Sequence, residues 1–198
     1  MGGTFDPIHQ GHLLIAELAR EEFALETILF VPAGIPAHKK GYSVSDAAVR
    51  WKMTCAAIEG NPAFQASRVE IDRPGPSYAV DTIRLLCAER PGQKPYFITG
   101  MDAILEILTW DRAAQLPGLA EFVACARPGN HSRQALDDLP AAFREHIHFM
   151  RTPLVEISST AIRARIAGGR TVRYMTPEAV RRIIEVERLY QEADTEVQ

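Results

Sequence analysis

The feature that most constrains this chain is the stretch Gly2–His12, a loop rich in glycine and proline that leads directly into a helix. The helix is predicted by apolar residues at helical spacing, namely Leu14, Ile15, Leu18 and Ala19. Glycines let the backbone lie against a ligand without a side chain between them. The N–H groups and the dipole of a helix N-terminus favour an anion. The stretch is therefore expected to bind an anionic group.

Two histidines of this stretch, His9 and His12, are three residues apart. In the first turn of a helix such residues share one face. Imidazoles beside a loop of amide donors suit a phosphate that gains charge during a reaction, and they suit hydride or acyl transfer much less well. An isolated HxGH pattern is also compatible with a plain turn that carries two surface histidines.

The stretch GGTFDPIHQGH resembles the (H/T)xGH signature of the nucleotidyltransferase superfamily, and more closely that of the bacterial nicotinate-mononucleotide adenylyltransferases. The length of the match and its position before a helix favour this interpretation over a plain turn. The resemblance implies catalytic roles for His9 and His12. It also implies ATP contacts from the following residues of the loop: Gly2, Gly3, Thr4, Phe5 and His12.

A second candidate lies at Ile157–Arg163, where three hydroxyls crowd a predicted helix start and an arginine follows one turn later. Taken alone, this pattern also fits a helix N-cap followed by a solvated arginine. The segment resembles the ISxTxIR motif that completes ATP binding in the same superfamily. The resemblance implies a second phosphate site, in which Arg163 is also catalytic, made of Ser158, Ser159, Thr160 and Arg163.

The segment Gly75–Thr82 resembles the PSYTxxT stretch at the mouth of the mononucleotide pocket. This chain has Ala79 where threonine is common, but in the family that position acts through its backbone N–H. Without the resemblance, these are ordinary residues of a first helical turn. The substrate contacts that the resemblance implies are Ser77, Tyr78, Ala79 and Thr82.

A tryptophan in the middle of the chain resembles the family's GxDxxxxxxxW pattern, in which the indole stacks on the nicotinate ring. Gly100 and Asp102 then belong to the ATP site, and Trp110 and Asp111 to the substrate site. A single tryptophan elsewhere is more often part of a core or an interface. Asp111 also departs from the aromatic residue or histidine that is expected there.

His38 and Lys39 lie in a loop bounded by glycine and proline, which resembles a PPHK loop that closes over the phosphates in the family. We expect both to be substrate contacts, although a solvated charged loop is the plainer alternative. No cluster of metal ligands accompanies Asp6, His9 and His12. Magnesium is therefore expected to enter with ATP as co-substrate, held by ATP oxygens and water rather than by a protein site.

Composition limits the remaining possibilities. A net charge of -3 offers no basic field for nucleic acid. Cys55, Cys87 and Cys125 are far apart among apolar neighbours, which predicts buried free thiols and a reducing cytoplasm. The chain has no signal peptide and no apolar run long enough to span a membrane, so no membrane partner is expected. A homo-oligomer is left open.

Strands are predicted to alternate with helices along the chain. The expected strands are 27–31, 64–71, 95–100, 122–126 and 146–150, and the expected helices after the first are 46–59, 77–87, 102–108, 158–169 and 177–184. Ser45 and Ser77 are expected to cap two of these helices. The pattern predicts one α/β domain over residues 1–198, a Rossmann-like doubly wound parallel sheet with helices on both faces. The resemblance places a further apolar strand before Gly2, and that strand is missing here.

The predicted function is transfer of the adenylyl group of ATP to nicotinate mononucleotide, which gives deamido-NAD and pyrophosphate. His9, His12 and the loop amides would stabilise the reacting phosphate, while Arg163 and the serines before it would hold pyrophosphate. One alternative is an adenylyltransferase that uses nicotinamide mononucleotide or pantetheine phosphate. Another is a nucleotide-binding sensor that has lost turnover.

Overall fold

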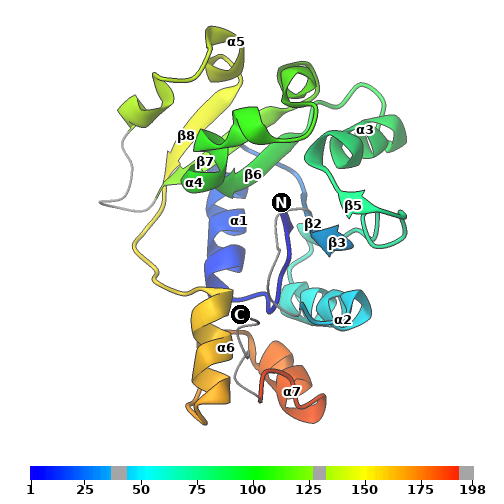
Figure 1. Cartoon of the computed structure of the whole chain (residues 1–198), viewed down its shortest axis with the longest axis vertical. Coiled ribbons are helices and arrows are strands. Elements are labelled where there is room, and N and C mark those ends of the chain that lie inside the picture. Colours follow the sequence, from blue (N-terminus) through cyan, green and yellow to red (C-terminus); the bar gives the residue numbers. More distant parts are fainter. Residues whose placement is uncertain (37–43, 127–132, 192–198) are drawn as a thin grey trace, which may run out of the picture.

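The computed structural model describes residues 1–36, 44–126 and 133–191, and its main strands are all parallel. One sheet has the order β1-β2-β4, built from β1 (Gly2–Gly3), β2 (Ile28–Pro32) and β4 (Phe64–Ala66). Another has the order β6-β7-β8, built from β6 (Tyr96–Gly100), β7 (Glu121–Ala126) and β8 (Ile147–Arg151). Strand β1 also contacts β6, so the two sheets lie side by side in the order β4-β2-β1-β6-β7-β8. The order in which strands are added along the chain reverses between β1 and β6. The predicted doubly wound α/β architecture is confirmed (Figure 1).

Helices connect the strands and cover both faces of the sheet (Figure 1). The α-helices are α1 (Gln10–Glu22), α2 (Ala47–Ile58), α3 (Ala79–Glu89), α4 (Met101–Leu105), α5 (Ala141–Arg144), α6 (Ser159–Ala167) and α7 (Glu178–Val186). Short 3₁₀ segments in the described residues are η1 (Ile107–Thr109), η2 (Ala113–Gly118) and η3 (Arg133–Leu136). A separate parallel pair is formed by β3 (Ile35–Pro36) and β5 (Pro76–Ser77).

Strand β7 shows why a continuous apolar run in this sequence forms a buried strand. Phe122 and Ala124 belong to one apolar cluster, with α3 and α4, whereas Val123 and Cys125 belong to the other, with α1, α2 and α7. Successive side chains of a strand point to opposite faces, so a strand covered on both sides must be apolar throughout. Cys125 is buried as expected, but Cys55 and Cys87 are only half-buried, and all three thiols are free.

Several predicted boundaries are wrong, and each has a local cause. Asp46, rather than Ser45, caps α2, since its carboxylate accepts the N–H of Ala48 at 2.7 Å. Ser77 lies in β5 and not at a helix cap, because its hydroxyl accepts the N–H of Gly34 at 3.0 Å. The strand expected over 64–71 ends at Ala66.

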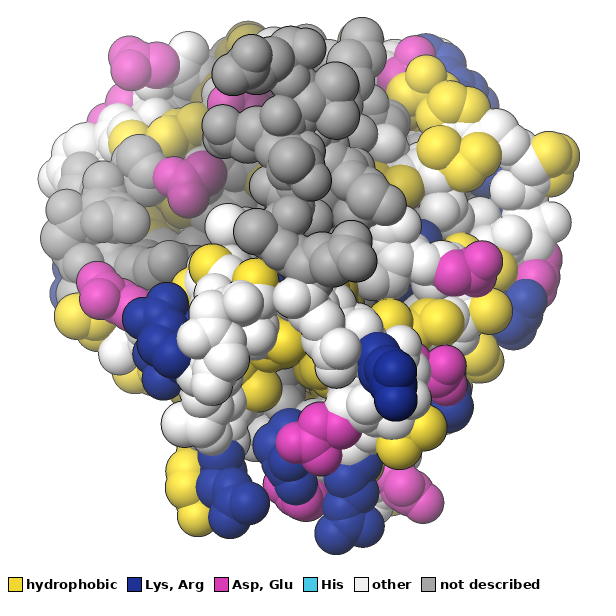
Figure 2. All heavy atoms as spheres, turned by 60° about the horizontal axis from the view of Figure 1, so that its bottom comes forward, with side chains coloured by type: hydrophobic (Ala, Val, Ile, Leu, Met, Phe, Trp, Pro, Cys, Tyr) yellow, Lys and Arg dark blue, Asp and Glu magenta, His cyan; other side chains and the backbone are white. Residues whose placement is uncertain are grey.

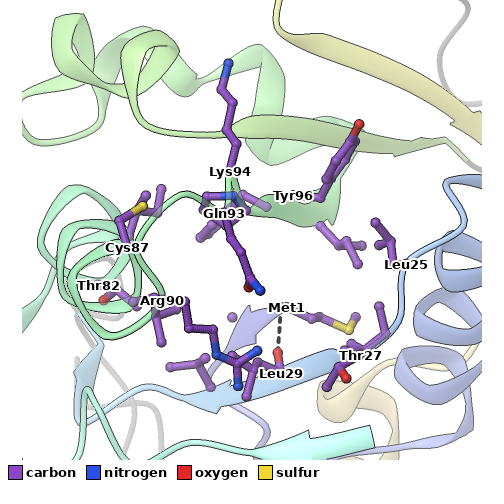
Figure 3. A pocket seen from close by; sticks show the side chains of 18 of the residues that line it. Met1, Leu25, Thr27, Leu29, Thr82, Cys87, Arg90, Gln93, Lys94 and Tyr96 are labelled. Carbon is purple, nitrogen blue, oxygen red and sulfur yellow. Dashed lines mark hydrogen bonds between the residues drawn. The ribbon is translucent and has the colours of Figure 1, made fainter. Parts of the chain in front are cut away.

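The chain start occupies a central place in the sheet. The amino group of Met1 donates to the carbonyl of Leu29 at 2.7 Å, and the carbonyl of Met1 accepts from Val31 at 2.9 Å. Strand β1 itself comprises Gly2 and Gly3. Beside Met1, between β2 and β6, lies a cavity of about 480 Å³ whose walls include Leu29 and Tyr96 (Figure 3).

The surface around α6 and α7 carries both signs of charge. Figure 2 shows basic and acidic side chains interspersed over this end of the molecule. Ion pairs join Arg181 to Glu178 at 2.6 Å and Lys52 to Glu187 at 2.7 Å. In the described part of the chain, no helix combines the length and the apolar character that crossing a membrane requires.

Candidate active site

The loop after β1 is held in shape by Phe5, whose side chain is buried and whose φ of 51° is left-handed. A Cβ on Gly3 would lie only 2.8 Å from the Phe5 ring, so the close turn requires glycine at that position. The same ring packs edge-on against His12, with 5.1 Å between ring centroids. The loop and the start of α1 therefore form one packed unit.

The two predicted histidines lie together at the start of α1. The rings of His9 and His12 stack with centroids 3.6 Å apart. Nδ1 of His12 accepts the backbone N–H of His9 at 3.2 Å. An imidazole nitrogen that accepts carries no proton, so a neutral His12 holds its proton on Nε2. This tautomer presents Nε2–H as a donor for a ligand oxygen.

The second predicted motif, at the start of α6, contacts the backbone of the same loop. Ser158 caps α6 by accepting the N–H of Ala161 at 3.1 Å, and the Ser159 hydroxyl donates to the carbonyl of Pro7 at 2.9 Å. Arg163 is buried and donates through Nη1 to the carbonyl of Asp6 at 2.9 Å. The alternative of a solvated arginine is therefore wrong. Thr160, by contrast, is exposed.

Asp6 ties the loop to distant parts of the chain. Its carboxylate is 1% exposed and accepts the Tyr190 hydroxyl at 2.5 Å and the backbone N–H of Ser45 at 3.2 Å. Burial, together with the neighbouring Asp6 charge, raises the pKa of Tyr190, so the phenol stays protonated and keeps donating. The segment after α7 is thus attached to the loop through the contact of Tyr190 with Asp6.

The site depends on one arginine for which sequence reasoning assigned no role. Arg50, on α2, is 1% exposed, and its guanidinium donates to the carbonyls of four residues. The distances are 2.9 Å to Thr4, 2.6 Å to Ala33, 3.0 Å to Gly34 and 2.9 Å to Ser45. One buried cation therefore fixes the ends of β1 and β2 relative to the start of α2.

A pocket of about 390 Å³ opens beside this loop, at the carboxyl ends of β1, β2 and β6. This is where doubly wound sheets bind ligands, next to the point where the strand order reverses. The predicted site residues among those lining it are Gly2, Gly3, Thr4, Ser77, Tyr78, Ala79, Trp110 and Asp111. The Trp110 ring lies edge-on to Phe97, with centroids 5.7 Å apart, so the indole is held in the wall.

Other predicted residues lie elsewhere. Thr82 does not line this pocket, and its hydroxyl donates to Glu70 at 2.6 Å inside the protein. Gly100 and Asp102 are exposed where β6 passes into α4, outside the pocket wall. His38 and Lys39 lie outside the described residues.

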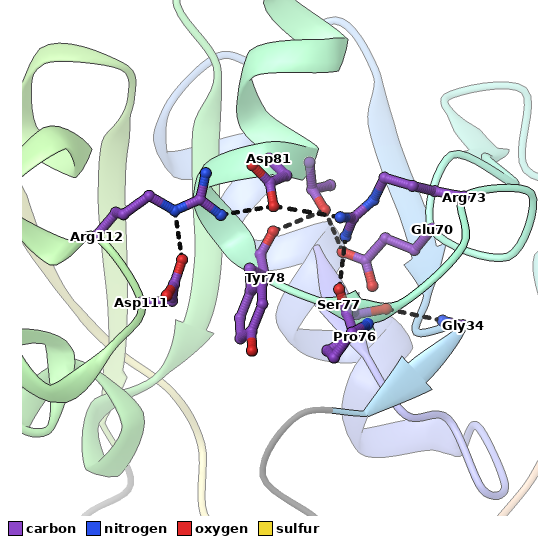
Figure 4. Close-up of polar contacts among 10 residues, drawn as sticks. Gly34, Glu70, Arg73, Pro76, Ser77, Tyr78, Asp81, Asp111 and Arg112 are labelled. Atoms are coloured by element: carbon purple, nitrogen blue, oxygen red, sulfur yellow. Dashed lines mark hydrogen bonds and ion pairs between the residues drawn. The ribbon is translucent and has the colours of Figure 1, made fainter.

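A chain of alternating charge that sequence reasoning missed starts at Asp111, which lines the pocket, and runs beside it to α3 (Figure 4). Asp111 pairs with Arg112, Arg112 with Asp81 at 2.7 Å, and Asp81 with Arg73 at 3.2 Å. The hydrogen bond from Arg112 holds the pKa of Asp81 below its usual range. Glu70, deeper in the pocket wall, has its pKa raised by burial.

Comparison with known proteins finds relatives over nearly the whole chain. A model of the cytidylyltransferase-like family matches residues 1–165. A protein of Moorella thermoacetica named "Probable nicotinate-nucleotide adenylyltransferase" is 49% identical over 194 residues, which cover 96% of this chain and 89% of that protein. A protein of the same name from Thermoanaerobacter sp. is 47% identical over 195 residues, which cover 96% and 92%.

The fold has a solved counterpart as well. The structure of the "Plasmodium falciparum nicotinic acid mononucleotide adenylyltransferase complexed with NaAD" matches with a TM-score of 0.80 at 19% sequence identity. The match covers 96% of this chain and 95% of that chain. At this level of identity the likeness shows a common fold.

Proposed function

The chain belongs to the cytidylyltransferase-like family and to the nicotinate-nucleotide adenylyltransferases, and from that premise we infer that it transfers the adenylyl group of ATP to nicotinate mononucleotide in NAD biosynthesis. The products are deamido-NAD and pyrophosphate. The observation that carries this function is the meeting of two phosphate motifs, around His12 and Arg163, at one loop beside a pocket with a tryptophan wall. The substrates are small molecules, and we place the reaction in the cytoplasm without a nucleic acid partner.

In the reaction, an oxygen of the acceptor phosphate attacks the α-phosphorus of ATP, and the bond from that phosphorus to pyrophosphate breaks. The acceptor is already an anion, so the protein needs no nucleophile of its own. Its work is to align the two phosphates and to stabilise the charge that spreads over them. We assign that role to Nε2–H of His12, to the stacked His9 and to the amides of the loop.

Arg163 has the geometry to hold both the loop and the leaving group. A guanidinium carries five N–H donors in a planar fork. One nitrogen of Arg163 donates to the carbonyl of Asp6, which fixes the side chain behind the loop. We propose that pyrophosphate oxygens bind the same fork together with the start of α6, where Ser158 and Ser159 lie.

The pyridine ring is assigned to the pocket between Trp110 and Tyr78. The helix N-terminus at Ala79 faces this pocket and offers amide donors to the nicotinate carboxylate. The backbone N–H of Trp110 is not one of these donors, because it donates to the carbonyl of Ile107 at 3.2 Å. Selection of the acid therefore depends on the start of α3 and on the charges around Asp111.

Magnesium is the ion expected to accompany ATP. Within residues 1–36, 44–126 and 133–191, no three His, Cys, Asp or Glu side chains are grouped so that they could hold a metal ion. The carboxylate nearest the loop, Asp6, is buried and accepts from Tyr190 and Ser45. We propose that the ion enters with the triphosphate, bound by its oxygens and by water.

Replacing Arg163 by lysine is expected to weaken ATP binding about tenfold, because lysine keeps the charge but loses the planar fork. The measurement is calorimetric titration with ATP. Arg165→Lys, two residues later on α6 with its side chain on the carbonyl of Thr171, is the matched control and should titrate like the unchanged protein. Identical ATP titration curves for the two variants would show that Arg163 does not bind ATP.

The function itself is tested by mixing the protein with ATP, magnesium and one acceptor at a time and measuring pyrophosphate. Release with nicotinate mononucleotide, at least about tenfold faster than with the amide mononucleotide, is the expected result. Pyrophosphate release only with pantetheine phosphate or only with the amide mononucleotide would show that this compound, rather than nicotinate mononucleotide, is the acceptor. No release with any acceptor, together with ATP binding, would identify a nucleotide sensor.

A further inference from the structure

The pocket assigned to the pyridine ring has an electrostatic problem. The acidic residues Asp111, Glu106 and Glu70 line it, whereas the proposed acceptor carries a carboxylate on its ring. Asp111 directly follows Trp110, the residue on which the ring would stack. An uncompensated negative charge at that position favours the neutral amide over the acid.

Arg112 supplies the compensating charge. Its Nε donates to the carboxylate of Asp111, and its Nη2 donates to Oδ2 of Asp81 at 2.7 Å. The guanidinium carbon also lies 5.9 Å from the centroid of the Tyr78 ring. One side chain therefore joins the segment after Trp110 to the first turn of α3, two segments that each supply residues to the pocket wall (Figure 4).

A second arginine completes the arrangement on the α3 side. Arg73 donates through Nη1 to the same Oδ2 of Asp81 at 3.2 Å, and through Nη2 to the carbonyl of Pro76 at 3.1 Å. Asp81 therefore has a partner besides Arg112. Arg73 therefore still balances Asp81 when Arg112 is removed, whereas the ion pair of Asp111 is with Arg112.

The backbone of Arg112 adopts an unusual conformation that its side-chain contacts stabilise. Its φ of 51° and ψ of 37° lie in the left-handed region, which non-glycine residues enter at a cost. This conformation lies between η1 and η2, where the chain turns just after Trp110. Such a conformation persists where contacts around it hold it, and here the side chain makes those contacts with Asp81 and Asp111.

We propose that Arg112 is a specificity-determining residue, which selects the pyridine acid over the amide by neutralising Asp111 beside the stacking surface of Trp110. The proposal rests on the proposed function and deepens it. Both Asp111 and Arg112 are more than a third exposed, so water screens their charges and the effect is moderate. We expect removal of the Arg112 charge to lower the acid-to-amide preference about five- to tenfold.

The test compares Arg112→Gln with the double variant Arg112→Gln/Asp111→Asn. For each protein, kcat/KM and the equilibrium Kd are measured with nicotinate mononucleotide and with nicotinamide mononucleotide. Arg112→Gln should lose activity and affinity mainly toward the acid. The double variant should recover the preference, because the charge that repels the acid is then gone. Arg182→Gln, which removes an exposed arginine of α7, is the matched control and should keep the original ratio.

The results separate this proposal from a purely structural role. If Arg112 only supported the fold, Arg112→Gln would weaken both mononucleotides alike and leave their ratio unchanged. That result overturns the proposal, and so does a lowered ratio that the double variant does not restore. Turnover of the unchanged protein decides the proposed function separately. Were that turnover absent, the ratio of the two Kd values would still decide the role of Arg112.

Discussion

Replacing His12 by alanine is expected to lower kcat for adenylyl transfer about a hundredfold or more, while the KM for ATP changes little. Nδ1 of His12 is engaged by the backbone N–H of His9, so the ring is fixed and its proton lies on Nε2. A preorganised donor of this kind acts on charge that develops in the transition state. Removing one such donor typically costs about 10²–10³ in kcat.

The measurement is steady-state kinetics with ATP and nicotinate mononucleotide, with thermal unfolding as the check that the fold persists. His148→Ala is the matched control, because that histidine lies on β8, where it contacts Glu121 at 2.8 Å. Its kcat should stay close to that of the unchanged protein. A His12 variant with a weaker KM for ATP and an unchanged kcat would show a residue that binds the ground state, and our assignment would be wrong.

Replacing Arg50 by methionine is expected to lower the free energy of unfolding by about 3–5 kcal/mol. The guanidinium is buried and serves the carbonyls of Thr4, Ala33, Gly34 and Ser45, which would lose their partner together. A buried acceptor left unpaired costs about 1–3 kcal/mol, and methionine offers no donor. Because Thr4 lies in the ligand loop, kcat should fall as well.

Urea unfolding of Arg50→Met is compared with that of Lys52→Met, a variant of the same helix. Lys52 makes an exposed ion pair with Glu187, and such pairs contribute at most about 1 kcal/mol. Arg50→Lys is a second variant that keeps the charge but not the fork, and it should fall between the two. Equal losses for Arg50→Met and Lys52→Met would show that the buried hydrogen bonds contribute little.

The sequence alone indicated the fold and the location of the ligand loop. Residues 122–126 of β7 are all apolar and buried, and α1 has its apolar residues at helical spacing, so the local sequence pattern predicts both elements. The glycines before His9 required a close turn, and Gly3 has no room for a Cβ. Strands and helices that alternate in this way allow few arrangements other than a doubly wound sheet.

Some signals were present in the sequence but were not used. Arg50 precedes the buried residues Met53 and Thr54 by three and four positions, which places it on the covered face of α2. An arginine on such a face needs partners, and the helix alone cannot supply them. The spacing therefore marked Arg50 as important without revealing what it would bind.

What only the tertiary structure decided is which distant residues serve the loop and the pocket. Arg50 reaches Thr4 across 46 residues, Arg163 reaches Asp6 across 157, and Tyr190 reaches Asp6 across 184. Sequence spacing reports on contacts within a helix or strand, because there the backbone fixes the geometry of near neighbours. Contacts between elements depend instead on how the elements pack. For that reason the motifs were readable in order along the chain, whereas the charges around Asp111 became visible only when α3 and η2 were brought side by side.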